Sequence, residues 1–203
     1  MNTANLLERN FDPVFHSQAC FRALLKAVAR PGRRIDLPSV SLEIPDPHDR
    51  NACLLLLALL DLEVSFNVMG RQSALLSDYL VANTSGRLAP VESADFVLVL
   101  GPESGGRVAR AKRGSLTAPH EGATLVYTPS SLHDTATLGD VVLRLEGPGI
   151  GAPRRLGIVG LAGSEVDCWY GLTDFPTGVD VWLAAADGGV AAIPRSTRWC
   201  REV

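Results

Sequence analysis

Apolar residues recur at helical spacing in two parts of the N-terminal half of the chain. Residues 11–30 are predicted to form a lead-in and a helix, which Pro31 and Gly32 end because proline cannot continue the hydrogen-bond ladder. Residues 73–82 give another helix of the kind that packs one stripe against a core. The apolar stripes consist of Phe21, Leu24, Leu25 and Val28 in the first helix, and of Leu75, Leu76, Tyr79 and Leu80 in the other.

Between these two helices lies a segment that is apolar on every side. Asp46 is a candidate N-cap, and Pro47 suits the first helical position that follows it. Residues 52–60 then contain no charged side chain, which is typical of a helix buried between a sheet and another layer or a partner chain. We predict a buried helix here.

Short runs rich in β-branched residues predict strands, and these dominate the second half of the chain. Asp187-Gly188-Gly189 has the composition of a hairpin turn between two of them. A last helix is predicted over residues 161–172. The predicted strands are residues 33–37, 63–69, 96–100, 123–127, 141–145, 179–185 and 190–193.

Helices alternate with strands early in the chain and strands prevail later. This order predicts an α/β fold in which a layered mixed sheet is covered by helices. A length of 203 residues without a repeat or a linker predicts a single domain over residues 1–203.

Composition and charge exclude several classes of function. The chain carries 19 basic and 22 acidic residues, a balance that speaks against general binding to nucleic acid or anionic membranes. Its longest apolar run is far shorter than the roughly 18 residues that cross a bilayer. The N-terminus has no pattern of a signal peptide, so we expect a cytoplasmic protein with four reduced, mostly packed cysteines.

The motifs of common catalytic sites are missing from the sequence. Residues 147–151, Gly-Pro-Gly-Ile-Gly, resemble a phosphate loop, but they lack the Lys-Ser/Thr pair and Pro148 removes an amide donor, so a structural turn is favoured. There is no Gly-x-Ser-x-Gly sequence, and the four histidines are scattered. We therefore predict no catalytic residue and no metal site in this chain.

Clustered arginines are the feature that points most clearly to a ligand. Guanidinium groups bind phosphate and carboxylate oxygens in pairs, so several arginines that converge on a cleft would hold a polyanion. The alternative is that each cluster is a solvated surface whose arginines pair with neighbouring acids. The clusters are Arg30/Arg33/Arg34, Arg107/Arg110/Lys112/Arg113, Arg154/Arg155 and Arg195/Arg198/Arg201.

Six ordered segments resemble the PhnH family, whose members are subunits of the bacterial carbon–phosphorus lyase system. Any one segment is a weak signal, but the ordered set spans nearly the whole chain. The segments are Phe11–Gly32, Leu57–Glu63, Arg113–Thr124, Leu145–Ile150, Phe175–Asp180 and Ile193–Thr197.

This resemblance implies a fold similar to the large domain of pyridoxal-phosphate-dependent transferases, used without the cofactor. It also implies a homodimer that joins PhnG, PhnI and PhnJ in a core complex, which works with PhnL. That assembly is linked to the transfer of a ribose 5-triphosphate unit from ATP onto a phosphonate, with loss of adenine. The residues of the chain agree with the absence of the cofactor, because Lys26 and Lys112 are the only lysines and neither follows a clear strand end.

The resemblance thus predicts an accessory subunit rather than a catalyst, with no cofactor of its own. Residues in or beside the resembling segments that could clamp phosphate or phosphonate oxygens are Arg22, Arg30, Arg33, Arg113 and Arg195. The alternative is that they pair with Asp36, Glu121 or Asp180 to fix turns. Two rival functions are a stand-alone enzyme and an anion-binding module, either of which would act on a phosphorylated or nucleotide small molecule.

Overall fold

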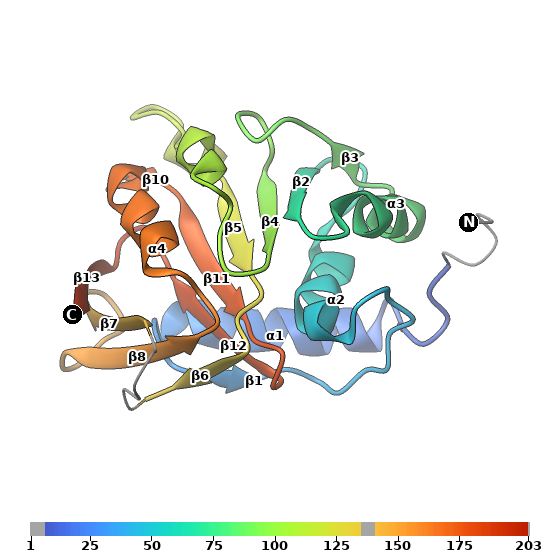
Figure 1. Ribbon diagram of the computed structural model, residues 1–203, viewed down its shortest axis with the longest axis horizontal. Coiled ribbons are helices and arrows are strands. Elements are labelled where there is room, and N and C mark those ends of the chain that lie inside the picture. Colours follow the sequence, from blue (N-terminus) through green and yellow to red (C-terminus); the bar gives the residue numbers. More distant parts are fainter. Residues whose placement is uncertain (1–6, 135–140, 203) are drawn as a thin grey trace.

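The computed structural model describes residues 7–134 and 141–202 as layers of helix and sheet (Figure 1). The central layer, sheet A, has seven strands in the order β1-β12-β11-β5-β4-β2-β3. Strands β11, β5, β4, β2 and β3 run parallel, and β12 and β1 are antiparallel to their neighbours. The strands are β1 (Ile35–Asp36), β2 (Ser65–Gly70), β3 (Arg87–Leu88), β4 (Phe96–Leu100), β5 (Thr124–Tyr127), β11 (Asp180–Ala184) and β12 (Gly189–Ile193).

The middle strands of sheet A are apolar on both faces. In β4, Val97 and Val99 enter the hydrophobic cluster on one face, while Leu98 and Leu100 enter the cluster on the other. Strands β5, β11 and β12 divide their side chains in the same way. A parallel sheet of this kind needs a cover on each face, which explains the layered fold.

Three helices cover one face of sheet A. They are α1 (Phe15–Ala29), α2 (Arg50–Leu59) and α3 (Ser73–Thr84), and the short helix η2 (Pro47–Asp49) precedes α2. The Asp46 side chain accepts a hydrogen bond of 3.0 Å from the backbone N–H of His48, as expected of an N-cap. Leu54, Leu55 and Leu56 are fully buried, which confirms the predicted buried helix.

The other face of sheet A is covered by a second sheet that the sequence analysis did not predict. Sheet B is antiparallel, with the order β13-β7-β8-β6, and it lies together with α4 (Gly163–Trp169) and η5 (Tyr170–Leu172) (Figure 1). Only β7 was expected, and as part of a single sheet. The strands are β6 (Ser131–His133), β7 (Val141–Glu146), β8 (Arg154–Val159) and β13 (Arg198–Glu202).

Sheet B was not predicted because arginines occupy many of its strand positions, so the alternation of buried and exposed residues was not recognised as that of a strand. In β8, Leu156 and Ile158 are buried, whereas Arg155 on the opposite face of the strand is exposed. In β13, Trp199 packs on Trp169 of the core while Arg198 and Cys200 are exposed. Arg155 and Arg198, which come from two of the predicted arginine clusters, therefore lie on the solvated face of sheet B.

The smaller elements connect these layers. The predicted hairpin is confirmed, since Ala184 pairs with Val190 in antiparallel register across residues 185–189. Residues 147–153 form the connection between β7 and β8, as the prediction of a structural turn at 147–151 requires. The remaining elements are η3 (Arg107–Arg110), η4 (Pro119–Glu121), β9 (Thr173–Asp174) and β10 (Thr177–Gly178).

The apolar stripe predicted for the first helix is not its buried face. Leu24 is buried together with Cys20, Ala23 and Ala27, but Phe21, Leu25 and Val28 are exposed at 51%, 53% and 39%. Small residues form the inner face because α1 lies close against β12 and α2. The larger side chains are left on the outside of the helix.

No helix in the described ranges is long and apolar enough to cross a membrane. The sequence predicts no signal peptide at the N-terminus. That segment lies partly outside the residues that the structure describes, which start at residue 7.

Asp49 introduces a buried carboxyl group at the start of α2. Its exposure is 6%, and its Oδ1 atom has no hydrogen-bond partner within the described part of the chain. Burial raises the pKa of Asp49 above the usual 3.8, and the neighbouring Asp46 carboxylate raises it further. Ionisation of Asp49 is therefore less favourable in the folded state than in the unfolded chain.

We predict that Asp49→Asn raises the melting temperature at neutral pH. Because the pKa of Asp49 is raised in the folded state, the protonated side chain stabilises the fold. This stabilisation is complete at a pH below the unfolded-state pKa of 3.8, and it is lost as the pH rises through the folded-state pKa. The variant keeps a neutral side chain at every pH, so its advantage should shrink as the pH falls. Thermal unfolding followed by circular dichroism measures this, with the exposed Asp78→Asn as control. An equal or lower melting temperature at neutral pH contradicts the prediction.

Leu56→Asp should abolish soluble folding, or lower the free energy of unfolding by about 4 kcal/mol, because it places an unpaired charge in the core. The matched control is Leu62→Asp, since Leu62 is 73% exposed. The measurement is the soluble yield and the urea midpoint of both variants. Wild-type stability of Leu56→Asp would show that α2 is accessible to water.

Candidate functional site

Of the five arginines predicted to bind an anion, only Arg195 lines one of the pockets described below. Arg22 lies on α1, Arg30 follows its last residue and Arg33 lies in the next turn, and all three are exposed. The structure brings Arg113 and Arg195 to one corner, where the Arg113 carbonyl and the Arg195 guanidinium both approach Gly122. Arg113 also donates from its guanidinium to the Gly171 carbonyl at 3.0 Å.

Arg195 acts as a clamp between three segments. Its Nε and Nη2 atoms donate to the two carboxylate oxygens of Asp180 at 3.2 and 2.6 Å. Further donors reach the carbonyls of Pro119 and Gly122, so the guanidinium ties the turn after β12 to η4 and to the start of β11. The sequence left two roles open for Arg195, anion binding and pairing with an acid such as Asp180, and the structure contains the pair with Asp180. Most donors of Arg195 are therefore used within the chain.

A polar pocket of about 270 Å³ lies beside this clamp. The turn that follows β12 forms one wall, closed by a hydrogen bond of 2.8 Å from the Thr197 N–H to the Pro194 carbonyl. Thr197 is 3% exposed, and no described residue provides a hydrogen-bond partner for its hydroxyl. The lining residues are Thr173, Phe175, Arg195, Ser196, Thr197, Arg198 and Trp199.

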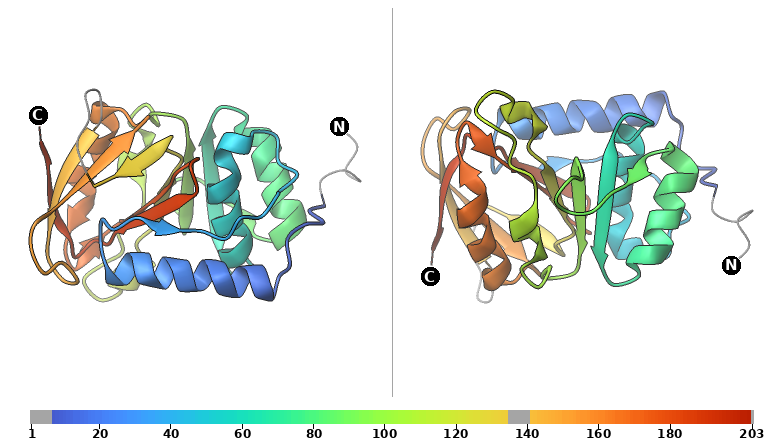
Figure 2. Two further views of the ribbon diagram at one scale, coloured as in Figure 1. Left: turned by 90° about the horizontal axis from the view of Figure 1, so that it is seen from below. Right: turned by 90° about the horizontal axis from the view of Figure 1, so that it is seen from above.

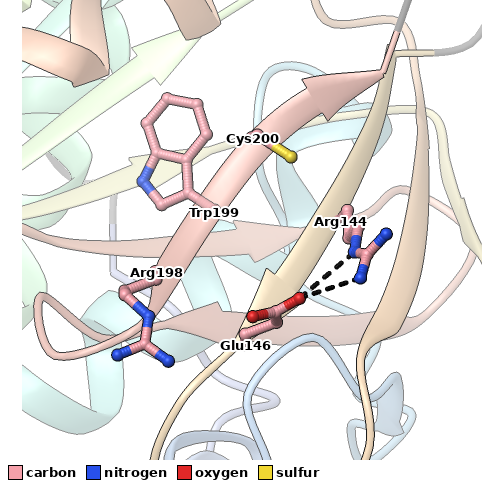
Figure 3. A pocket seen from close by; sticks show the side chains of 5 residues that line it. All are labelled: Arg144, Glu146, Arg198, Trp199 and Cys200. Atoms are coloured by element: carbon pink, nitrogen blue, oxygen red, sulfur yellow. Dashed lines mark hydrogen bonds and ion pairs between the residues drawn. The ribbon is translucent and has the colours of Figure 1, made fainter.

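A second pocket, also of about 270 Å³, continues onto the outer face of sheet B (Figure 3). It is lined by Arg144, Glu146, Arg198, Trp199 and Cys200. The strand register places Cys200 opposite Arg144 and Arg198 opposite Glu146. Arg144 bends along its own strand to donate to Glu146 at 3.0 Å. Because the two pockets share Arg198 and Trp199, we call them together the β13 groove.

The wall of the β13 groove rests on a buried network behind it. Trp199 stacks at a tilt on Tyr170, with ring centroids 4.4 Å apart, and meets Trp169 edge-to-face at 5.8 Å. The Trp169 indole N–H donates to the Tyr127 hydroxyl at 2.9 Å, and that hydroxyl donates to Glu165 at 2.8 Å. Burial and the Glu165 carboxylate raise the pKa of Tyr127 well above its usual value, so Tyr127 stays a donor.

Glu165 is the centre of this network although it is 1% exposed. Its other carboxylate oxygen accepts hydrogen bonds from the backbone N–H and the hydroxyl of Ser104, at 2.8 and 2.9 Å. A buried carboxylate is tolerated when its oxygens accept several hydrogen bonds. The network fixes α4 against β5 and the loop after β4, and thereby fixes the stacked rings.

The groove combines groups that suit a small oxyanion. Arg198 is exposed, and no ion pair within residues 7–134 and 141–202 involves it. Ser196 and Thr197 place two hydroxyl groups next to it in sequence. A guanidinium and hydroxyl donors are the usual partners of phosphate oxygens. Arg198 was predicted from the sequence in one cluster with Arg195, whereas the two hydroxyls and Arg144 were not predicted. The Pro-Arg-Ser-Thr sequence at residues 194–197 is the pattern from which the hydroxyl pair could have been predicted.

The described residues offer little for metal or covalent catalysis. No three His, Cys, Asp or Glu side chains among them gather as metal ligands. Lys26 is exposed on α1 and Lys112 is ion-paired with Asp95, so neither lysine fits a Schiff base with pyridoxal phosphate. The Ser131 hydroxyl lies 2.9 Å from His133 Nε2, which is a Ser–His contact. It lies within edge strand β6, outside the β13 groove.

All four cysteines are free thiols. Cys20 and Cys53 are buried, whereas Cys168 is partly exposed and Cys200 is exposed. Burial raises the pKa of Cys20 to about 11 and raises that of Cys53 well above its usual value, so these two behave as packed apolar residues.

We predict that Arg195→Ala lowers stability, whereas Arg198→Ala lowers phosphate binding. Arg195→Ala removes the ion-pair partner of Asp180, whose own side chain is 28% exposed, and should cost about 2 kcal/mol of unfolding free energy. Arg198→Ala should leave stability unchanged and weaken the binding of inorganic phosphate. Urea unfolding and isothermal calorimetry measure the two effects. Equal stability of both variants would show that the clamp contributes nothing.

A family model described as bacterial phosphonate metabolism protein (PhnH) matches residues 9–200. A comparison with curated proteins gave no match.

Proposed function

Since the chain belongs to the PhnH family of bacterial phosphonate metabolism proteins, we propose that it is a non-catalytic subunit of the carbon–phosphorus lyase core complex. The family match over residues 9–200 is the observation that carries this proposal. In this role the chain supports the reaction in which a phosphonate displaces adenine from ATP, giving a ribose 1-alkylphosphonate 5-triphosphate. The reacting groups are supplied by other subunits.

The chemistry of the β13 groove supports such a supporting role. Arg198 and the neighbouring hydroxyls can hold phosphonate or phosphate oxygens. The Tyr127–Glu165 network that supports the groove is buried and fully engaged, so it positions the wall rather than moving protons. Arg113 and Arg195 contribute mainly by fixing the corner beside the groove.

The proposed partners follow from the family and not from the coordinates. We propose a homodimer that assembles with PhnG, PhnI and PhnJ, and with PhnL, in the cytoplasm. We also propose that the arrangement of sheet A and its helices is that of the large domain of pyridoxal-phosphate-dependent transferases. The exposed Lys26 and the paired Lys112 support a version of that fold without the cofactor.

A second candidate function is a stand-alone enzyme or binding module for a phosphorylated small molecule. The observation that favours it is the pocket itself, which is lined both by the exposed Arg198 and by Thr197, whose buried hydroxyl has no partner among the described residues. This candidate requires the isolated chain to bind or convert its ligand without partners.

One experiment separates the two candidates. The chain is expressed alone and together with PhnG, PhnI and PhnJ, and each preparation is incubated with PhnL, ATP and methylphosphonate. We expect co-elution of the four subunits, and release of adenine only from the preparation that contains all of them. Adenine release by the isolated chain would support the stand-alone enzyme, and failure to co-elute would contradict the subunit proposal.

A further inference from the structure

The outer face of α1 carries a regular apolar seam. Its positions are Val14, Gln18, Phe21, Leu25 and Val28, spaced by four, three, four and three residues. This is the spacing at which one helix packs against another. All five are exposed, the four apolar ones at between 39% and 69%. In both views of Figure 2, α1 runs along an outer edge of the molecule.

The seam does not serve the fold of this chain. The residues of α1 that reach the core are Cys20, Ala23, Leu24 and Ala27, on another side of the helix. Large apolar side chains grouped on one face, with polar residues beside them, mark an interaction surface rather than ordinary surface scatter. Gln18 is the single polar member, and a polar residue in such a seam specifies register.

One flank of the seam is cationic and carries no acid. Residues 13–35 contain five cations and no aspartate or glutamate, although the chain as a whole has a net charge of −3. Arg22, Lys26, Arg30 and Arg33 are exposed, and none has an ion-pair partner in the described part of the chain. Arg34, the fifth cation, pairs with Asp36 and Asp187, and outside residues 13–35 eight basic side chains are paired, as Arg195 is with Asp180.

This charge distribution disfavours a second copy of the chain as the occupant. If two copies packed seam to seam with their α1 helices antiparallel about a two-fold axis, the cationic flanks of both copies would come together without an acid between them. Like charges facing each other across an interface cost several kcal/mol. A partner that fits must instead offer an apolar stripe bordered by carboxylates.

We propose that the outer face of α1 docks an acidic amphipathic helix of another subunit of the assembly. The seam packs against the apolar stripe of that helix, and Arg22, Lys26, Arg30 and Arg33 pair with its acidic flank. Three of the arginines predicted from sequence to bind a small anion are thereby assigned to a protein partner. The inference rests on the proposed function, because it takes PhnG, PhnI or PhnJ as the source of the helix.

The experiment titrates the full chain into a purified PhnG–PhnI–PhnJ preparation and measures the dissociation constant. The test variants are Arg22→Glu/Lys26→Glu and Leu25→Asp, all at exposed positions of α1. The matched controls are Arg71→Glu/Arg87→Glu and Leu62→Asp, at exposed positions outside α1. Melting curves of all variants verify that each is folded. A parallel measurement adds vesicles of phosphatidylserine and phosphatidylcholine to the wild-type chain.

We expect both α1 variants to bind at least about tenfold more weakly and the controls to bind like the wild type. Added salt should strongly weaken binding by the wild type and the controls, but not by the α1 variants. Equal binding by all variants overturns the docking surface while the subunit proposal stands. If the wild-type chain does not bind, the subunit proposal fails and the inference fails with it. Loss of a homodimer in the α1 variants, or vesicle binding that these variants lose, assigns the seam to a second copy or to a lipid surface and overturns the proposal.

Discussion

The middle strands of sheet A bury apolar side chains on both faces, and the rest of the architecture follows from that constraint. Val97 and Leu98 of β4 are neighbours in sequence yet belong to opposite clusters of the core. Neither face can be left to water, because each exposed square ångström of apolar surface costs about 25 cal/mol. Helices α1, α2 and α3 cover one face, and sheet B with α4 covers the other.

The cover made by sheet B brings polar chemistry to the surface. An antiparallel sheet needs only one apolar face, so β7, β8 and β13 alternate core residues with arginines. The outer face therefore carries Arg144, Arg155 and Arg198, while Trp199 reaches inward to the rings held by Glu165. The β13 groove is thus a consequence of how the second face of sheet A is closed.

The cover made by α1 has a different consequence. Small residues let the helix approach β12 closely, and its large apolar side chains are then left outside. A surface of this kind is consistent with a chain that works inside an assembly, as the phosphonate metabolism family suggests. The buried polar groups of the molecule, above all Glu165 and the Arg195–Asp180 pair, hold the elements behind these surfaces in place.

Local patterns predicted the elements whose stability is decided within a few residues: the capped and wholly apolar α2, the β-branched strands of sheet A, and the hairpin turn at Asp187-Gly188-Gly189. The ordered segments also identified the family. Pairing between distant strands was not predictable, because β13 and β7 meet through contacts that local propensity does not encode. The roles of the arginines depended on the same contacts. Composition could not tell Arg195, which meets Asp180 only when β11 and the turn after β12 come together, from Arg22, which the fold leaves in water.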